Sequence, residues 1–211
     1  MVNALRVLAA TFLLSMLAIN AWAEDFVEGK DYALVKGEVD DSTKIEIREF
    51  FWYGCPHCYK LEESIEPWKD KLPADVSFVR TPATFTEHWL PHARAFFVAQ
   101  NLGFANKMHT PLFDAIHKDH QPLMTDAALQ DFVVTQGGDR QKVTEMWNSF
   151  LVNTAIHKAD QMGRNYQLEG VPAIIVNGKY MTDGTRAGDF SRMLQVVDFL
   201  IAKERAEKGK K

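Results

Sequence analysis

Residues 44–58 read KIEIREFFWYGCPHC, and this stretch decides the fold class. Its first part alternates apolar and charged residues and then becomes continuously apolar, which predicts a buried central strand. From Pro56 to about Leu72 the apolar spacing changes to that of a helix. Two cysteines, Cys55 and Cys58, therefore lie where the strand gives way to the helix.

The segments on either side extend this unit into an α/β sheet. A second short strand is expected at 76–79, and a strand–helix–strand unit implies parallel pairing with a right-handed crossover. Residues 171–180 predict a β-hairpin with Asn177-Gly178 at the turn, and a last helix is expected after Asp189. This order fits a small mixed sheet with helices on both faces.

The stretch between the second strand and the hairpin is helical. Thr125 and Asp139 are typical N-caps, and we expect the helix after Asp139 to continue to Leu151. A longer helix is expected from about 153 to 168. The composition is too apolar for a disordered linker, so residues 83–151 are predicted to form a compact all-helical insertion.

Residues 1–23 predict a secretory signal peptide. They combine a positively charged start, a short apolar stretch and the small-x-small pattern of residues 21–23. The apolar stretch is short for a bilayer, so we expect cleavage before Glu24 and no stable membrane insertion, with a retained anchor as the alternative. Residues 24–82 and 152–211 are then expected to form one domain around the insertion.

Charge and cysteine content narrow the function. The formal net charge is −4 without a basic cluster, which argues against nucleic-acid binding. Cys55 and Cys58 are the only cysteines, and a loop this small makes a weak structural crosslink, which favours a dithiol that cycles. The alternative is half of a zinc site. There is no second cysteine pair, and the nearest histidine pair, His88 and His92, lies far downstream, so we expect no metal and no cofactor.

The predicted helix start gives the cysteine pair its chemistry. With Cys55 as N-cap and Pro56 at the first helical position, the amides of His57 and Cys58 can point at the Cys55 sulfur. These amides, the helix dipole and His57 all favour a thiolate and lower the pKa of Cys55. A stabilised thiolate leaves readily, so the disulfide is expected to pass its oxidation to another dithiol, with Cys58 as the more buried partner sulfur.

Two further sites follow from the pattern. Glu49 shares a strand face with Ile47 and Phe51, so burial should raise its pKa, and it could exchange a proton with Cys58. The alternative is a register in which Glu49 reaches solvent. Val171-Pro172, just before a strand, is a candidate cis peptide that would place the Val171 backbone beside the disulfide to pair with an extended substrate. An ordinary trans proline is the alternative.

Together these residues resemble the DsbA family of periplasmic thiol:disulfide oxidoreductases. The resemblance rests on residues 49–51, on the Cys-Pro-His-Cys centre at 55–58, on residues 147–150, and on residues 170–172 and 176–180. It covers essentially the whole mature chain. The exception is Arg80-Thr81-Pro82-Ala83-Thr84, which cannot be aligned, so the charged partners of the buried acid cannot be placed.

The resemblance implies a thioredoxin-like fold with an inserted helical domain, located in the periplasm. It implies a protein that oxidises reduced, unfolded exported proteins and is reoxidised by a DsbB-type inner-membrane partner that passes electrons to quinone. We expect the chain to work as a monomer. The roles it implies are nucleophile for Cys55, buried partner for Cys58, thiolate stabiliser for His57, buried acid for Glu49 and cis proline for Pro172. Three tryptophans, Trp52, Trp89 and Trp147, are candidate reporters of the redox state.

Two alternatives remain open. A reductase or isomerase on the same scaffold is disfavoured by the histidine between the cysteines and by the lack of a dimerisation domain. A peptide-binding chaperone would use the groove beside Val171-Pro172 and leave the cysteines incidental. Disulfide transfer to a reduced, unfolded substrate separates these functions.

Overall fold

The computed structural model describes residues 26–39 and 43–209, so the predicted signal peptide lies outside the described residues. Five strands form one mixed sheet in the order β1-β5-β4-β2-β3. The central strand β2 pairs in parallel with β3 and antiparallel with β4. The strands are β1 (Ala33–Leu34), β2 (Ile45–Phe51), β3 (Val76–Pro82), β4 (Ala173–Val176) and β5 (Tyr180–Asp183).

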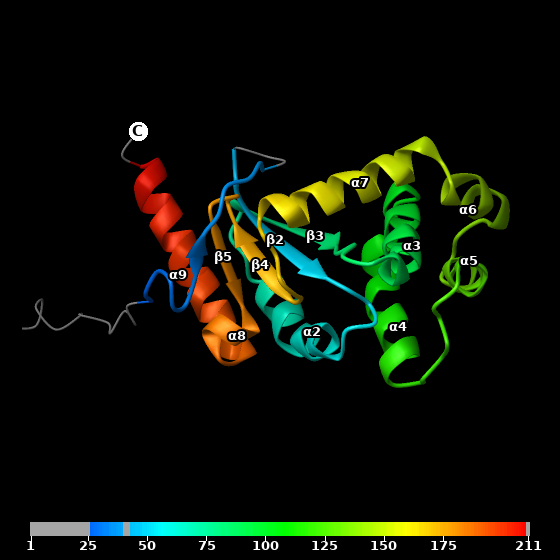
Figure 1. The fold of residues 1–211 in the computed structure, drawn as a ribbon, viewed down its shortest axis with the longest axis horizontal. Coiled ribbons are helices and arrows are strands. Elements are labelled where there is room, and N and C mark those ends of the chain that lie inside the picture. Colours follow the sequence, from blue (N-terminus) through cyan, green and yellow to red (C-terminus); the bar gives the residue numbers. More distant parts are fainter. Residues whose placement is uncertain (1–25, 40–42, 210–211) are drawn as a thin grey trace, which may run out of the picture.

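The helices divide into those that cover the sheet and those at its end. The sheet is covered by α2 (Pro56–Lys69), α7 (Phe150–Asn165), α8 (Gly184–Ala187) and α9 (Phe190–Lys208). At one end lie η1 (Glu87–Trp89), α3 (Leu90–Asn101), α4 (Ala105–His117), α5 (Asp126–Thr135) and α6 (Arg140–Trp147) (Figure 1). In the described part of the chain, no helix is both long enough and apolar enough to cross a bilayer.

The sheet is covered on both faces, which explains why all seven residues of β2 are buried. On one face, Ile45 and Ile47 pack with side chains of α2 and α9. On the other, Phe50 meets Tyr166 just after α7, with ring centroids 5.8 Å apart. The predicted layering, a mixed sheet between helices, is confirmed.

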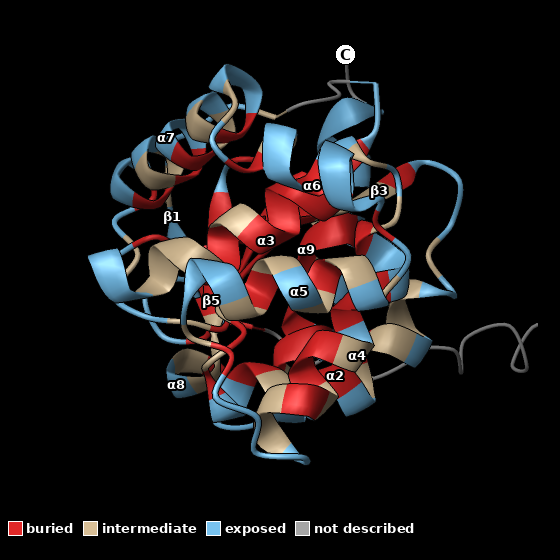
Figure 2. Cartoon of the chain, turned by 90° about the vertical axis from the view of Figure 1, so that its right-hand side faces the viewer, coloured by how far each residue is buried: buried red, intermediate tan, exposed pale blue. Residues whose placement is uncertain are grey.

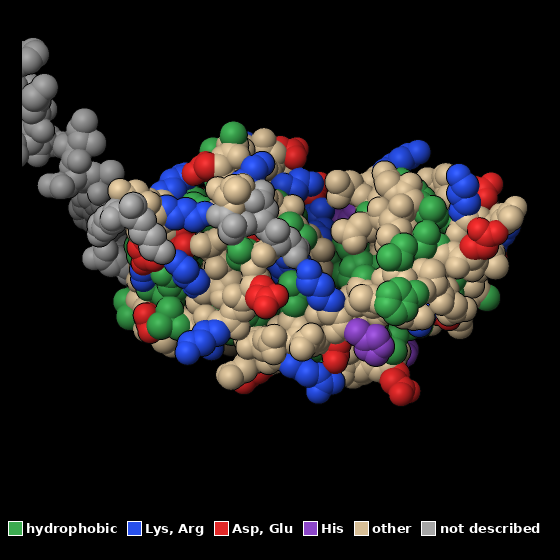
Figure 3. Space-filling view, turned by 90° about the horizontal axis from the view of Figure 1, so that it is seen from above, with side chains coloured by type: hydrophobic (Ala, Val, Ile, Leu, Met, Phe, Trp, Pro, Cys, Tyr) green, Lys and Arg blue, Asp and Glu red, His purple; other side chains and the backbone are tan. Residues whose placement is uncertain are grey.

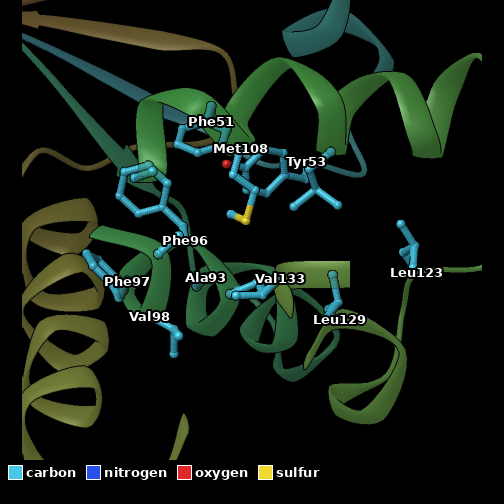
Figure 4. Packing of buried hydrophobic residues seen from close by; sticks show 14 of the residues in the cluster. Phe51, Tyr53, Ala93, Phe96, Phe97, Val98, Met108, Leu123, Leu129 and Val133 are labelled. Atoms are coloured by element: carbon cyan, nitrogen blue, oxygen red, sulfur yellow. The ribbon is translucent and has the colours of Figure 1, made fainter. Parts of the chain in front are cut away.

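The helical block has its own core, which is continuous with the redox segment. α3 contributes six buried residues to it, and the outer faces of α5 and α6 are exposed (Figure 2). Phe51 and Tyr53, from the end of β2 and the loop after it, pack into the same cluster as Phe96 and Met108 (Figure 4). The segment that carries the cysteines is therefore held between the sheet and the helical block.

The local signals mostly give the elements expected of them. Thr125 and Asp139 each accept a backbone N–H at the start of a helix, as predicted. Asn177 and Gly178 both have positive φ, 50° and 65°, at the predicted hairpin turn, and residues 177–179 connect the two strands. The short edge strand β1 and the single-turn helix α8 were not predicted.

The expected helix from Asp139 to Leu151 was wrong. α6 ends at Trp147, and the Ser149 hydroxyl accepts the Val152 N–H at 3.3 Å, which starts α7. The new helix turns its first residues outward, so Phe150 and Leu151 are 83% and 58% exposed instead of packed. α7 thus begins two residues before the expected boundary of the insertion.

Charged side chains of both signs are interspersed over the face drawn in Figure 3. Because the signs alternate, this face carries no broad patch of one charge.

Candidate active site

Cys55 is the N-cap of α2, as the sequence predicts. Its backbone is extended, with φ −89° and ψ 115°, and Pro56 follows within the first helical turn. The Cys58 N–H donates to the Cys55 sulfur at 3.4 Å, and the Cys55 N–H donates to the Trp52 carbonyl at 2.9 Å. Proline fits this position because its missing N–H would have had no partner inside the helix.

The two thiols have opposite proton affinities. The pKa of Cys55 is lowered to about 6, first by a hydrogen bond from the Cys58 thiol and then, against some burial, by the amides of Cys58 and His57 and the charge of His57. Burial raises the pKa of Cys58, and the hydrogen bond to Cys55 adds to the effect. At neutral pH the anion therefore resides on Cys55, which makes it the nucleophile and the better leaving group.

The peptide bond between Val171 and Pro172 is cis, so the cis alternative is the correct one. It brings the Val171 carbonyl to the cysteine pair, 3.5 Å from the Cys55 sulfur, where the protonated form of Cys55 can donate to it. The segment is far from Cys55 in sequence but adjacent in space.

A groove of about 1140 Å³ opens beside this loop. One wall is the start of α2, with the exposed His57 and with Lys60, and another is residues 166–173. The third comes from the segment between β5 and α9. Since Val171 and Pro172 line the groove, an extended chain lying in it would pass the Cys55 sulfur.

Glu49 is fully buried, which excludes the register in which it reaches solvent. In the parallel pairing of β2 with β3 it lies opposite Arg80, whose Nε donates to Glu49 Oε2 at 3.0 Å. The other oxygen, Oε1, has no hydrogen-bond partner among the described residues. Burial raises the pKa of Glu49 even though the Arg80 charge opposes the shift. A raised pKa makes this carboxyl a candidate proton donor.

Arg80, Glu62 and Glu66 are site residues that the sequence analysis missed. Arg80 Nη2 lies 3.2 Å from Glu62 Oε2 and 2.5 Å from Glu66 Oε1. Burial raises the pKa of Glu62 to about 7 against the opposing charge of Arg80. Two signals could have revealed them: Glu62 is one helical turn after Cys58, and in-register parallel strands place Arg80 opposite Glu49.

Two of the three tryptophans lie together near the cysteines. Trp52 and Trp89 stack with ring centroids 4.5 Å apart and an interplanar angle of 6°. Trp147 is buried in the helical core. Their use as redox reporters stays a prediction. Within the described ranges, no group of three or more His, Cys, Asp or Glu side chains is arranged to hold a metal ion.

Comparison with known proteins assigns the family. A family model described as "DSBA-like thioredoxin domain" matches residues 75–195. This chain belongs to the DsbA family. It is 42% identical over 194 residues to the thiol:disulfide interchange protein DsbA of Pseudomonas aeruginosa, covering 91% of this chain and 92% of the relative. The DsbA of Bordetella pertussis is 35% identical, with 79% of each chain covered.

Solved structures of the DsbA family agree with the fold. The crystal structure of Pseudomonas aeruginosa DsbA matches with a TM-score of 0.83 and covers 90% of this chain and 99% of its own. The oxidoreductase DsbA from Xylella fastidiosa is 32% identical, with a TM-score of 0.80 and coverage of 86% and 98%. The predicted thioredoxin-like fold with an inserted helical domain is therefore confirmed, and the chain is a disulfide oxidoreductase of this family.

Proposed function

We propose that the protein oxidises reduced, unfolded proteins exported to the periplasm by donating its Cys55–Cys58 disulfide. The observation that carries this direction is the low pKa of Cys55 beside the high pKa of Cys58. An anion that is stable on Cys55 stabilises the dithiol form of the protein relative to its disulfide. The relatives named thiol:disulfide interchange protein DsbA support the same reaction type.

The exchange proceeds in two displacements. A substrate thiolate attacks the Cys55 sulfur; a substrate–Cys55 disulfide forms, and the Cys55–Cys58 bond breaks with its electron pair on Cys58. Cys58 takes up a proton, for which the nearby Glu49 is the source. The second substrate thiolate then attacks the first substrate sulfur, and Cys55 leaves as its stabilised thiolate. The substrate gains one disulfide and the protein is left as the dithiol.

The groove and the cis-proline loop position the substrate. The Val171 backbone beside Cys55 offers main-chain groups to an extended segment, and Pro172 fixes that backbone. Pro56 and His57 complete the exposed edge of the redox loop, where His57 favours the Cys55 thiolate.

We further propose the wider setting that the family resemblance implies. The leader, residues 1–23, would direct the chain to the periplasm, where it works as a monomer. A DsbB-type membrane partner would restore the disulfide and pass the two electrons to quinone. Residues 24–82 and 152–211 would form the thioredoxin-like domain, with residues 83–151 inserted.

Stoichiometric transfer tests the function. The oxidised protein is mixed with a reduced, unfolded protein that has two cysteines, and both are assayed for thiols. We expect one substrate disulfide for each disulfide consumed. Reduced Cys58→Ser, mixed with the disulfide form of the same substrate, should trap a mixed disulfide through Cys55 as one substrate thiolate is released. Binding without transfer would favour a chaperone, and reduction of an oxidised substrate would favour a reductase.

Glu49 is tested separately from the cysteines. Glu49→Gln keeps the shape of the buried side chain but cannot exchange a proton. We expect a folded protein whose rate of disulfide transfer has an altered pH dependence. An unchanged profile would remove the proposed role of Glu49.

A further inference from the structure

A line of buried polar contacts runs from the redox loop through the helical insertion to the acid cluster, which consists of Glu49, Glu62 and Glu66 around Arg80. Tyr53, two residues before Cys55, is fully buried, and its hydroxyl lies 3.0 Å from Nδ1 of His109 on α4. The other ring nitrogen, Nε2, lies 3.3 Å from Glu62 Oε1 on α2. His109 thus contacts the redox loop with one nitrogen and faces the acid cluster with the other.

The chemistry of the three groups limits where their protons lie. Burial lowers the pKa of His109 to about 3, with the Arg80 charge adding to the effect, so the imidazole is neutral and has one donor and one acceptor. Burial raises the pKa of Tyr53, so its hydroxyl keeps its proton. When Glu62 is ionised, Tyr53 donates to Nδ1 and the Nε2 proton faces the carboxylate. When Glu62 is protonated, the opposite tautomer fits.

We propose that His109 is a positioning residue for thiol exchange: by linking Tyr53 to Glu62, it favours the ionised form of Glu62. Nε2 has no aligned hydrogen-bond partner among the residues that the structure describes. The Glu62 carboxylate lies within ion-pair distance of it, with Oε1 at 3.3 Å. The Tyr53 hydroxyl, by donating to Nδ1, keeps the ring proton on Nε2.

Charges from the neighbouring elements also act on this link. Arg80 of β3 favours ionised Glu62, Glu66 of α2 opposes it, and Lys69 of α2 favours it. Glu49 of β2 acts on the His109 ring itself. Because burial and these charges together bring the pKa of Glu62 to about 7, the gain or loss of one hydrogen bond changes its charge near neutral pH.

The charge on Glu62 bears on the thiols through Glu49. Ionised Glu62 raises the pKa of Glu49, and Glu49 in turn acts on the pKa of Cys58. Ionised Glu62 therefore favours the protonated form of Glu49, the form that can pass a proton to Cys58. This consequence rests on the proposed function.

The link is tested by following the Glu62 carboxyl with carbon-13 NMR in the reduced protein as pH is varied. In His109→Leu we expect the pKa of Glu62 to rise by about one unit, a tenfold change in proton affinity. His109→Gln retains an N–H donor and should recover part of the shift. The matched control is His92→Gln: His92 is equally buried on α3 but bonds the Leu123 carbonyl. It should leave Glu62 unchanged.

Two results would overturn the assignment. One is a folded His109→Leu protein with the wild-type titration of Glu62; the other is an equal shift in the His92 control. If His109→Leu does not fold, Tyr53→Phe decides, because it removes one oxygen and should move Glu62 in the same direction by a smaller amount. No movement in that variant counts against the link.

The connection between Glu62 and thiol exchange is tested separately, by measuring the rate of disulfide transfer as a function of pH. The pH profile of disulfide transfer should move upward in His109→Leu together with Glu62. A profile that stays in place while Glu62 moves overturns the connection to thiol exchange. If the wild-type protein transfers no disulfide, the proposed function fails, yet the carboxyl titration still decides whether His109 controls Glu62.

Discussion

The low pKa of Cys55 can be divided into a side-chain and a backbone part by the substitution Cys58→Ala. The variant removes the Cys58 thiol, the first cause of the shift, but keeps the amides of Cys58 and His57 and the helix start at Pro56. The chain has only two cysteines, so every thiol signal in the variant comes from Cys55.

The size of the effect follows from the strength of one hydrogen bond. A bond to a charged acceptor from a weak S–H donor contributes about 1.4 kcal/mol, which is about one pKa unit. Starting from a pKa of about 6, Cys55 in Cys58→Ala should titrate near 7. At pH 7 its thiolate fraction should fall from about nine-tenths to about one-half. Cys58→Ser keeps a donor and should stay closer to the wild-type value.

The assay is the far-ultraviolet absorbance of the thiolate against pH, with the alkylation rate as a second measure. A midpoint near 9, the value of an ordinary thiol, would show that the helix start contributes nothing. A midpoint that stays near 6 would show that the Cys58 side chain contributes nothing. Either outcome would contradict a shared contribution of side chain and backbone to the pKa of Cys55.

The lowered pKa of Cys55 also makes a small contribution to the reduction potential of the Cys55–Cys58 disulfide. A lowered thiol pKa stabilises the dithiol form as pH rises above about 6. At pH 7 this amounts to at most about 1.4 kcal/mol, or about 1 kcal/mol after solvent screening, which is about 20–30 mV for two electrons. The disulfide becomes a stronger oxidant by that amount.

Three further predictions concern stability. Arg80→Met should lower the free energy of unfolding by about 3–5 kcal/mol because it leaves buried carboxylates unpaired. The control, Arg140→Met, breaks an exposed pair with Asp131 and should lower it by less than about 1 kcal/mol in the same denaturant titration. The raised pKa of Glu62 means that, between pH 7 and 4.5, the folded state binds a proton which the unfolded state releases. The free energy of unfolding should therefore rise by up to about 3 kcal/mol as pH falls across this range. Glu62→Gln should lose this increase, and identical pH–stability curves for the two proteins would contradict the assignment. Gly178→Ala should lower the free energy of unfolding by at least about 1 kcal/mol, because φ is +65° and the new methyl would meet the Gly37 carbonyl oxygen at 2.8 Å. The control, Gly170→Ala, has open space around it and should leave thermal unfolding nearly unchanged.

Features that depend on short-range interactions could be predicted from the sequence, whereas features that depend on long-range contacts could not. Helix caps at Thr125 and Asp139, and the hairpin turn at Asn177, depend on neighbours within a few residues, and the structure has all three. The break at Ser149 was missed because the apolar spacing before and after it continues as if one helix ran through. Strand β1 was missed because two residues give no measurable period.

The sequence by itself determined that Cys55 starts a helix, because Pro56 and the change of apolar period lie beside it. That placement alone supplies the amides that lower the thiol pKa. The tertiary structure decided the rest: the burial of Glu49, its pairing with Arg80, and the Val171 carbonyl beside Cys55. These contacts join residues 31 and 116 positions apart, and burial depends on which elements cover a strand. Local patterns cannot specify either, because both arise only when the chain packs.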